Sequence, residues 1–243
     1  MSAAAEEVVF LDDVTVDYID HMGDDAAVTQ AARVSVVGEN KKAQKADAKD
    51  KEKGLIGYLM RKKHGSPFEH TAMKFYVKAP IFVFREFHRH RIGFSYNEMS
   101  GRYTKLLPEF YVPKKSRPLV NTGGSANPKF EPGSNFQTRL LERLLQHGYK
   151  VTWAIYSALI KAGIGNEVAR VILPVGIYSQ MYVTCNARSL MSFLSLRTFE
   201  PEATFPSNPQ HEIELVARKM EEEFARLFPI TYEAWVARGR VAP

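Results

Sequence analysis

The chain has 243 residues, of which 45% are hydrophobic, and its 15 Phe and 11 Tyr exclude a largely disordered protein. Its single cysteine, Cys185, excludes a disulfide-bonded scaffold. The 33 Lys and Arg outnumber the 27 Asp and Glu, and the net charge of +6 favours anionic partners without choosing among nucleic acid, lipid and small phosphorylated molecules.

The sequence shows no sign of membrane insertion or secretion. No segment approaches the roughly 18 consecutive apolar residues of a membrane span. Residues 1–7 have neither the basic start nor the apolar core of a signal peptide. We therefore expect a cytoplasmic protein with no membrane partner.

Both strands and helices are predicted in the first part of the chain. Residues 14–19 predict a strand and 24–34 a helix, whereas the Lys-, Asp- and Glu-rich segment 39–53 predicts a solvated linker or frayed helix. Residues 55–63 resume a helical pattern that stops at Gly65. Residues 73–77 then predict a strand, and Pro80 opens a helix over the sequence IFVFREFHRHR.

The remaining elements are mostly helical. Residues 106–113 are a short aromatic stretch, and 114–134 predict a long loop because Pro, Gly, Asn and Ser crowd there. The longest helix is predicted over 136–162, and shorter elements follow: a helix at 167–173, a strand at 177–184 and a helix at 187–198. An amphipathic helix opens at Pro209 and closes at Pro229. The absence of regular βαβ alternation and of hairpin runs favours the α+β class.

Common nucleotide and metal motifs are absent. The chain has no GxxxxGK[ST] loop, and Gly163-Ile164-Gly165 follows a predicted helix instead of a strand, which argues against a Rossmann domain. The histidines His64, His70, His88 and His90 lie close in sequence without an HExxH or paired CxxC pattern, so no metal site is predicted.

A basic run and a polar run stand next to each other. The run Phe87-His88-Arg89-His90-Arg91 alone fits an anion site or a helix end, where each cation contributes about 0.3–1 kcal/mol. Residues 95–103 (SYNEMSGRY) add hydroxyls, an amide, a carboxylate and another Arg. Guanidinium forks and hydroxyls together are typical of phosphate and pyrimidine recognition.

Two later clusters of polar and charged residues can also be explained without a binding site. Glu167 and Arg170 stand three residues apart, which suits a plain ion pair on a helix surface. In residues 186–197, Arg188, Ser192 and Ser195 form a polar stripe, whereas Arg197 shares an apolar face. Such an arginine must find an anion or a polarised ligand, or else extend to water, which is the commoner outcome.

Four ordered segments resemble the flavin-dependent thymidylate synthases. They are Arg89-His90-Arg91 with residues 95–103, the earlier segment 64–70 (HGSPFEH), residues 167–170 before Leu173-Pro174, and residues 186–197. The resemblance covers most of the chain. It implies a mixed β-sheet flanked by long helices in a single domain over residues 1–243, with a charged linker at 39–53 and a long loop at 114–134.

The resemblance implies reductive methylation of dUMP to dTMP. Methylenetetrahydrofolate would donate the carbon, NADPH would supply the reducing equivalents, and FAD would carry the hydride. The enzyme would act as a homotetramer whose subunits share active sites, so an isolated monomer would be inactive, and it would bind no nucleic acid.

The resemblance also assigns site residues by motif position. The predicted FAD contacts are Ser66, Arg89, His90, Arg91, Glu98, Asn186, Ala187, Arg188 and Ser192. The predicted dUMP contacts are Glu86, Phe87, His88, Arg89, Glu98, Met99, Ser100, Gly101, Arg102, Arg170 and Arg197. Arg197 is the predicted catalytic residue, because a guanidinium beside the pyrimidine N3 favours the ionised ring.

Ser95 and Cys185 invite a nucleophile reading that we set aside. Neither has an evident adjacent base in sequence, and the resemblance assigns no covalent protein nucleophile. A buried, inert Cys185 is expected.

Two positions depart from the family pattern. Eight residues separate Arg91 from Ser100 where seven are usual, and we expect the extra residue to form a bulge or wider turn near Gly93. Ser192 stands where longer amides are common, which predicts a missing or water-mediated flavin contact.

The main rival function is a basic nucleic-acid-binding module. It would use residues 87–91 with the aromatic side chains Phe94, Tyr96 and Tyr103, and its affinity would depend strongly on salt. A structural or adaptor protein has little support beyond the Lys-rich segment 39–53.

Overall fold

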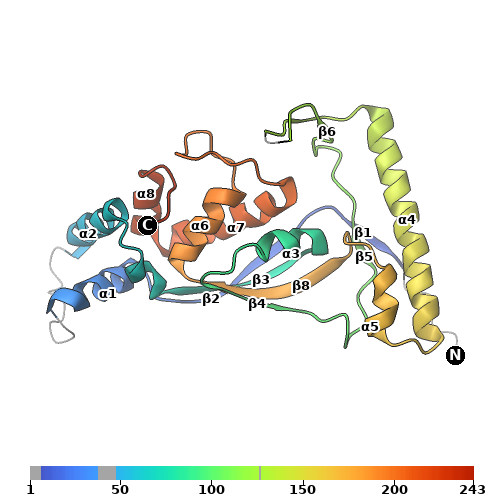
Figure 1. Ribbon diagram of the computed structural model, residues 1–243, viewed down its shortest axis with the longest axis horizontal. Coiled ribbons are helices and arrows are strands. Elements are labelled where there is room, and N and C mark those ends of the chain that lie inside the picture. Colours follow the sequence, from blue (N-terminus) through green and yellow to red (C-terminus); the bar gives the residue numbers. More distant parts are fainter. Residues whose placement is uncertain (1–6, 38–47, 126) are drawn as a thin grey trace. The chain divides into compact units, whose positions relative to one another are not determined.

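The computed structural model describes residues 7–37, 48–125 and 127–243, which form two compact units (Figure 1). Unit 1 comprises the residues up to Val14, Lys78–Glu86 and Glu98–Met181, and unit 2 comprises Thr15–Val77, Phe87–Asn97 and Tyr182–Pro243. Part of the predicted linker at 39–53 lies outside the described residues, and its remainder begins a helix. The organisation into one domain stays a prediction.

Unit 1 is built around the longest helix, α4 (Asn135–Lys161). A capping box starts this helix: the Ser134 side chain accepts from the Gln137 N–H, and the Gln137 side chain accepts from the Ser134 N–H. One face of α4 presents Tyr149, Trp153 and Tyr156 to a core that also contains Phe110 and Ile177. The predicted helix over 136–162 is confirmed.

Short strands and helices complete unit 1. Strand β1 (Val9–Leu11) pairs in parallel with β5 (Glu109–Tyr111), with Phe10 opposite Phe110. Strands β6 (Val120–Asn121) and β7 (Phe130–Glu131) pair antiparallel within the predicted loop 114–134. The predicted helix 167–173 is split into α5 (Asn166–Ala169) and the 3-10 helix η2 (Arg170–Ile172), which ends before Pro174.

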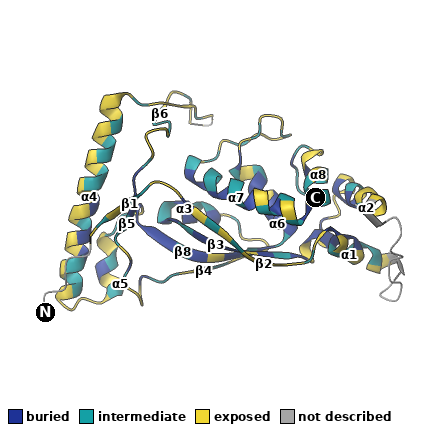
Figure 2. Ribbon diagram, turned by 180° about the vertical axis from the view of Figure 1, so that it is seen from behind, coloured by how far each residue is buried: buried dark blue, intermediate teal, exposed yellow. Residues whose placement is uncertain are grey.

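The apolar side chains of α4 are only partly covered in this chain, and Figure 2 shows exposed positions along the helix. Tyr156 is buried and Leu145, Leu159 and Ile160 pack against the core, whereas Leu140, Leu144 and Ile155 are exposed. Phe136, also on α4, is exposed to 73%. Periodicity therefore predicted the helix, but not which of its apolar side chains the chain itself would cover.

The main sheet has the strand order β2-β3-β8-β4, formed by β2 (Thr15–Met22), β3 (Ala72–Pro80), β8 (Tyr178–Cys185) and β4 (Phe94–Glu98). The boundary between the units falls within β3 and β8. Three of these strands were predicted, and β4 corresponds to the polar run of the signature. The fold is α+β, as the sequence predicts.

Each helix of unit 2 buries part of its surface. It contains α1 (Asp25–Val37), α2 (Ala48–Lys62), the 3-10 helix η1 (Ser66–Glu69), α6 (Ala187–Arg197), α7 (His211–Leu227) and α8 (Pro229–Val236). The predicted apolar face of α7 is buried at Ile213, Ala217, Met220 and Phe224. Pro229 ends α7 as predicted and also occupies the first turn of α8, where its fixed φ is favourable.

A buried carboxylate from α1 caps α8. Asp25 accepts hydrogen bonds from the backbone N–H groups of Ile230 and Thr231 at 2.8 and 2.9 Å and from the Thr231 hydroxyl at 2.6 Å. These are N–H groups that a helix start leaves without an intrahelical partner. This contact joins two residues, Asp25 and Thr231, that are 206 positions apart in the sequence.

Helix α3 (Ile81–Phe87) is shorter than predicted. The His90 N–H donates to the Phe87 carbonyl oxygen at 2.8 Å, and the Tyr96 hydroxyl lies 2.8 Å from the same oxygen. These contacts turn the chain after Phe87, so the basic run leaves the helix instead of continuing it. No helix in the described part of the chain is both long enough and apolar enough to cross a membrane.

Candidate functional site

Arg197 and the middle residue of the RHR run are hydrogen-bonded to each other. Arg197 ends α6, and its Nε–H donates to Nε2 of His90 over 3.0 Å. The rings of Phe193 and Phe94 pack on the imidazole with centroid separations of 4.9 and 6.0 Å. An accepting Nε2 carries no proton, so this contact requires neutral His90.

The surroundings of His90 favour its neutral form. Burial, and second the positive charge of Arg197, lower the pKa of His90 from 6.5 to about 4. The Tyr96 hydroxyl lies 2.8 Å from the His90 carbonyl oxygen and fixes the turn that carries the imidazole. Burial, the largest cause, raises the pKa of Tyr96, so its hydroxyl keeps its proton.

A pocket of about 760 Å³ opens beside His90 within unit 2. Three guanidinium groups, those of Arg89, Arg91 and Arg188, line it together with His90 and Ser192. All five are predicted FAD contacts. Arginines around one cavity suit a ligand with phosphate groups, because a guanidinium can donate two parallel hydrogen bonds.

Arg188 is fixed at the rim of this pocket. Its Nη1 pairs with Glu69 Oε1 at 2.6 Å and its Nε donates to the Pro243 carbonyl oxygen at 2.7 Å. A Cβ on Gly65 would collide with the Arg188 guanidinium. The glycine of the HGSPFEH segment therefore leaves room for this arginine, which links two of the motifs in space.

The other predicted FAD residues do not line the pocket. Asn186 instead caps α6, since its Oδ1 accepts from the Ser189 N–H at 2.8 Å. The Ala187 N–H donates to Thr71 Oγ1 at 3.1 Å, and Ser66 begins η1 with an exposed side chain. Glu98 lines a different pocket, in unit 1.

The chain makes a left-handed turn at Gly93. Gly93 has φ +67, and a Cβ there would collide with Ser189 Oγ and lie 2.6 Å from Asn186 Nδ2. The preceding residue, Ile92, lies on the pocket rim and is exposed to 87%. That this turn takes up the extra residue of the signature stays a prediction.

A second pocket, of about 460 Å³, lies within unit 1. The predicted dUMP residues Glu98, Met99, Ser100, Gly101 and Arg170 line it. Gly101 is buried, and a Cβ there would approach Arg170 Cδ to 3.4 Å, so this glycine lets the chain pass close to the arginine.

Arg102 stands apart from this pocket. Its Nε pairs with Glu167 Oε1 at 2.9 Å, and its guanidinium lies 5.4 Å from the centre of the Tyr103 ring. Both partners of the ion pair are largely exposed, so it contributes little to stability. Glu167 thus pairs with Arg102. The spacing in the sequence instead suits an ion pair of Glu167 with Arg170 on one helix surface.

The remaining predicted dUMP residues lie around the end of α3. The Phe87 ring is fully buried and stacks on Phe193 with a centroid separation of 5.0 Å, so it could meet a ligand only through its backbone. His88 is exposed and packs edge-on against Tyr96. Glu86 belongs to unit 1, whereas His88, Arg89 and Arg197 belong to unit 2.

Sequence reasoning missed several pocket residues. Glu69, Phe94 and Ser189 line the larger pocket, and Arg85 and Ser179 line the smaller one. Glu69 and Ser189 stand inside segments that carry the family resemblance, and Arg85 precedes the basic run, so proximity to the motifs was the available signal. Ser179 sits in a strand and gives no such signal.

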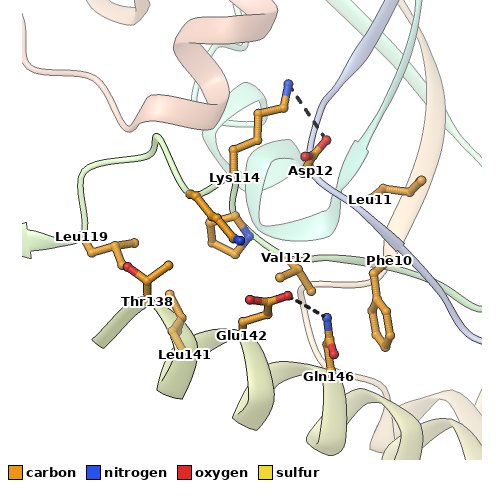
Figure 3. A pocket seen from close by; sticks show the side chains of 12 residues that line it. Phe10, Leu11, Asp12, Val112, Lys114, Leu119, Thr138, Leu141, Glu142 and Gln146 are labelled. Atoms are coloured by element: carbon orange, nitrogen blue, oxygen red, sulfur yellow. Dashed lines mark hydrogen bonds and ion pairs between the residues drawn. The ribbon is translucent and has the colours of Figure 1, made fainter. Parts of the chain in front are cut away.

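A third pocket, of about 240 Å³, contains none of the predicted site residues. Figure 3 shows it between β1 and α4 in unit 1, where Val112 and Leu141 line it together with polar side chains such as Glu142. Lys114 at its edge pairs with Asp13 Oδ2 at 3.3 Å and lies 3.9 Å from Asp12 Oδ1. These charges are already paired, and the geometry gives no sign of catalysis there.

The two nucleophile candidates occupy ordinary positions. Cys185 is buried at the end of β8, and burial raises the pKa of its thiol, which disfavours the reactive thiolate. Ser95 lies on β4 with an exposed side chain. Within residues 7–37, 48–125 and 127–243, no group of three or more His, Cys, Asp and Glu side chains could hold a metal ion.

Gly93→Ala is expected to destabilise the protein. The new Cβ would strain a positive φ and push against the capping pair at the start of α6, which should lower the unfolding free energy by about 1–3 kcal/mol in thermal or urea denaturation. Gly57→Ala is the matched control, because Gly57 lies in α2 with nothing within 4 Å of an added Cβ, and it should raise stability by up to about 1 kcal/mol. Equal effects of the two substitutions would contradict the role of Gly93.

His90 is expected to titrate near pH 4. Its folded pKa is depressed below the unfolded value of 6.5, so the unfolded chain binds the proton first and stability should fall as the pH drops from about 6.5 to about 4. NMR titration of the ¹³C-labelled His90 ring measures this value directly. A midpoint near 6.5 would show that burial and the charge of Arg197 do not lower the pKa of His90 in solution.

Comparisons with known proteins show the family of this chain. The family described as thymidylate synthase complementing protein matches residues 17–230. The chain is 52% identical over 234 residues to the flavin-dependent thymidylate synthase of Streptomyces avermitilis, covering 96% of this chain and 95% of that protein. It is 48% identical over 235 residues to the enzyme of the same name from Tropheryma whipplei, covering 97% of each.

Solved structures give the same result. The UMP/dUMP methylase PolB from Streptomyces cacaoi, bound with 5-Br UMP, superposes with a TM-score of 0.89 at 44% identity, covering 97% of this chain and 99% of that one. The same protein bound with 5-Br dUMP superposes equally well, at 45% identity. The matched motifs, the pockets that collect them and the coverage of nearly the whole chain place this protein in the flavin-dependent thymidylate synthase family.

Proposed function

We propose that this protein methylates dUMP to dTMP, with methylenetetrahydrofolate as carbon donor, FAD as hydride carrier and NADPH as reductant. Family membership and the nucleotide analogues bound to PolB support the reaction and the pyrimidine nucleotide substrate. The observation that carries the proposal is the hydrogen bond between Arg197 and His90, because it puts the predicted catalytic guanidinium beside the large arginine-lined pocket.

The large pocket fits a flavin dinucleotide. The guanidinium groups of Arg89, Arg91 and Arg188 match its two phosphates, and a volume of about 760 Å³ lies in the usual range of cofactor sites. Gly93 lies between the pocket residues Ile92 and Phe94, and a Cβ on it would collide with residues at the start of α6. FAD supplies hydride transfer when bound, and the side chains of this pocket bind and orient it.

The smaller pocket supports binding of an anionic substrate. Arg85 and Arg170 provide positive charge there, Ser100 provides a hydroxyl, and Glu98 can accept hydrogen bonds. The Ser179 hydroxyl lines the same pocket, is buried, and has no hydrogen-bond partner among the described residues. These groups would hold the phosphate and sugar of the nucleotide.

Arg197 would activate the pyrimidine without covalent attachment to the protein. Its Nε–H is held by His90, which orients the planar fork, and the N–H groups on the terminal nitrogens would donate to the ring near N3. A guanidinium stays protonated at any working pH, so it stabilises negative charge that develops on the ring. His90 stays neutral and serves as the acceptor that sets this orientation.

Assembly into a homotetramer with shared sites is part of the proposal. The exposed apolar side chains of α4, including Phe136, Leu144 and Ile155, form the kind of surface that other copies of a chain cover. The predicted substrate residues are divided between the two units, which suits an active site completed by neighbouring subunits.

The test of the reaction is tritium release from 5-tritiated dUMP with and without FAD. We expect a yellow protein whose colour bleaches with NADPH, and tritium release that requires both FAD and methylenetetrahydrofolate. A colourless protein that cannot be reconstituted with FAD, and that binds polynucleotides in a salt-dependent manner, would instead favour the nucleic-acid-binding alternative.

Arg197→Ala is expected to abolish turnover while FAD binding largely survives. Loss of a preorganised charge at the reacting ring should lower kcat by at least about 100-fold, and flavin fluorescence titration would show whether the cofactor still binds. Arg197→Lys should also lose most activity, because an ammonium cannot donate to His90 and to the pyrimidine in the same planar geometry. Ser95→Ala is the control and should keep measurable activity; complete loss in a folded protein with both ligands bound would revive a serine nucleophile.

A further inference from the structure

The last turn of α6 is held by Arg240 on both sides of Arg197. The Ser195 hydroxyl lies 2.6 Å from the Arg240 carbonyl oxygen, and Arg240 Nη2 donates to Thr198 Oγ1 at 2.8 Å. The Thr198 hydroxyl in turn donates to the Leu194 carbonyl oxygen at 2.7 Å. One arginine therefore contacts the residue two before Arg197 and the residue directly after it.

Arg240 is itself rigidly held. It is buried, its Nη1 pairs with Glu221 Oε1 at 2.6 Å, and its guanidinium lies 4.2 Å from the centre of the Trp235 ring. The Tyr232 hydroxyl donates to the same Glu221 oxygen at 3.0 Å. A network in which the buried charges are paired and hydrogen-bonded has little freedom to rearrange.

The backbone of Arg240 is strained. Its φ is +58, in the left-handed region that a residue with a Cβ rarely adopts. Such strain persists only where the surrounding contacts determine the conformation, and it is found mainly at functional sites. The contacts to Ser195 and Thr198 involve the carbonyl oxygen and the side chain of this residue, so both depend on its backbone conformation.

The chain beyond α6 is fixed as well. The Phe199 N–H donates to Glu214 Oε1 at 3.0 Å, and Arg218 Nη2 donates to the Phe199 carbonyl oxygen at 2.7 Å. Arg218 also pairs with Glu200 at 2.6 Å. Helix α7, which contacts α6, thus holds the two residues that follow Thr198 (Figure 1).

We propose that Arg240 and Thr198 are positioning residues that hold the end of α6 so that Arg197 meets His90 and the substrate in one orientation. An arginine side chain has several rotatable bonds, and its guanidinium is fixed only when both its backbone and its head are anchored. The Arg240 network anchors the backbone and His90 anchors the head. The catalytic consequence rests on the proposed role of Arg197.

Thr198→Val tests this role, because valine keeps the size of the side chain and removes the hydroxyl. We expect kcat for tritium release to fall about tenfold, with KM for dUMP and the FAD dissociation constant within about twofold of wild type. The pKa of His90 should rise above about 4 as Arg197 loses its orientation. Thr198→Ser restores the hydroxyl and should recover both values.

Thr231→Val is the matched control. Thr231 is also buried, and its hydroxyl donates to Asp25 at 2.6 Å instead of meeting α6. This variant should lower the melting temperature while kcat and the His90 titration stay at wild-type values. A Thr198→Val protein with unchanged kcat and unchanged His90 pKa would overturn the proposal, and so would an equal loss of kcat in Thr231→Val.

Two further outcomes separate this inference from the proposed reaction. If Arg197→Ala keeps full turnover, the catalytic role of Arg197 fails, and the His90 titration in Thr198→Val still decides whether Arg240 and Thr198 orient the guanidinium. If Thr198→Val does not fold, Ser195→Ala removes the other contact to Arg240 within a helix that tolerates alanine, and the same two measurements apply.

Discussion

The hydrogen bond from Arg197 to His90 is the interaction on which the candidate site depends. It joins the end of α6 to the turn after α3, two segments separated by 107 positions, and it requires a neutral imidazole. Burial, the nearby positive charge and the rings of Phe94 and Phe193 all favour that neutral form. The hydroxyl of Tyr96 then fixes the backbone of the turn. A basic motif thus contains one member that works as an acceptor because it has no charge.

The structure shows where many of the arginines that contribute to the net charge of +6 lie. Arg89, Arg91 and Arg188 surround the large pocket, and Arg85 and Arg170 line the smaller one, whereas other arginines serve the structure. Arg240 pairs with Glu221 in the interior, and Arg218 pairs with Glu200 and Glu214. Carboxylates satisfy the structural arginines, whereas the arginines at the pockets can donate to phosphate. Arg188 combines a pocket position with a carboxylate partner, Glu69.

Residues 135–161 show which features of a helix its apolar periodicity can predict. Apolar spacing predicts α4 to within a residue at each end, because this signal is local, and the structure adds a capping box at its first turn. The same spacing could not show that Leu144 and Ile155 would remain exposed, since covering them requires surface from outside the helix. Residues 81–91 show the opposite case, because a tertiary contact from Tyr96 at the Phe87 carbonyl helps to end α3 before the basic run.

The sequence alone determined the α+β class, the positions of α4, α6 and α7, and the family, because these follow from local patterns and from motifs read in order. It also placed Arg197 on the apolar face of its helix. Only the tertiary structure decided that His90 would accept from Arg197, and that Gly65 and Gly93 would make room for side chains far along the chain. Each of these depends on atoms from segments distant in sequence, and no pattern within one segment records such a distance.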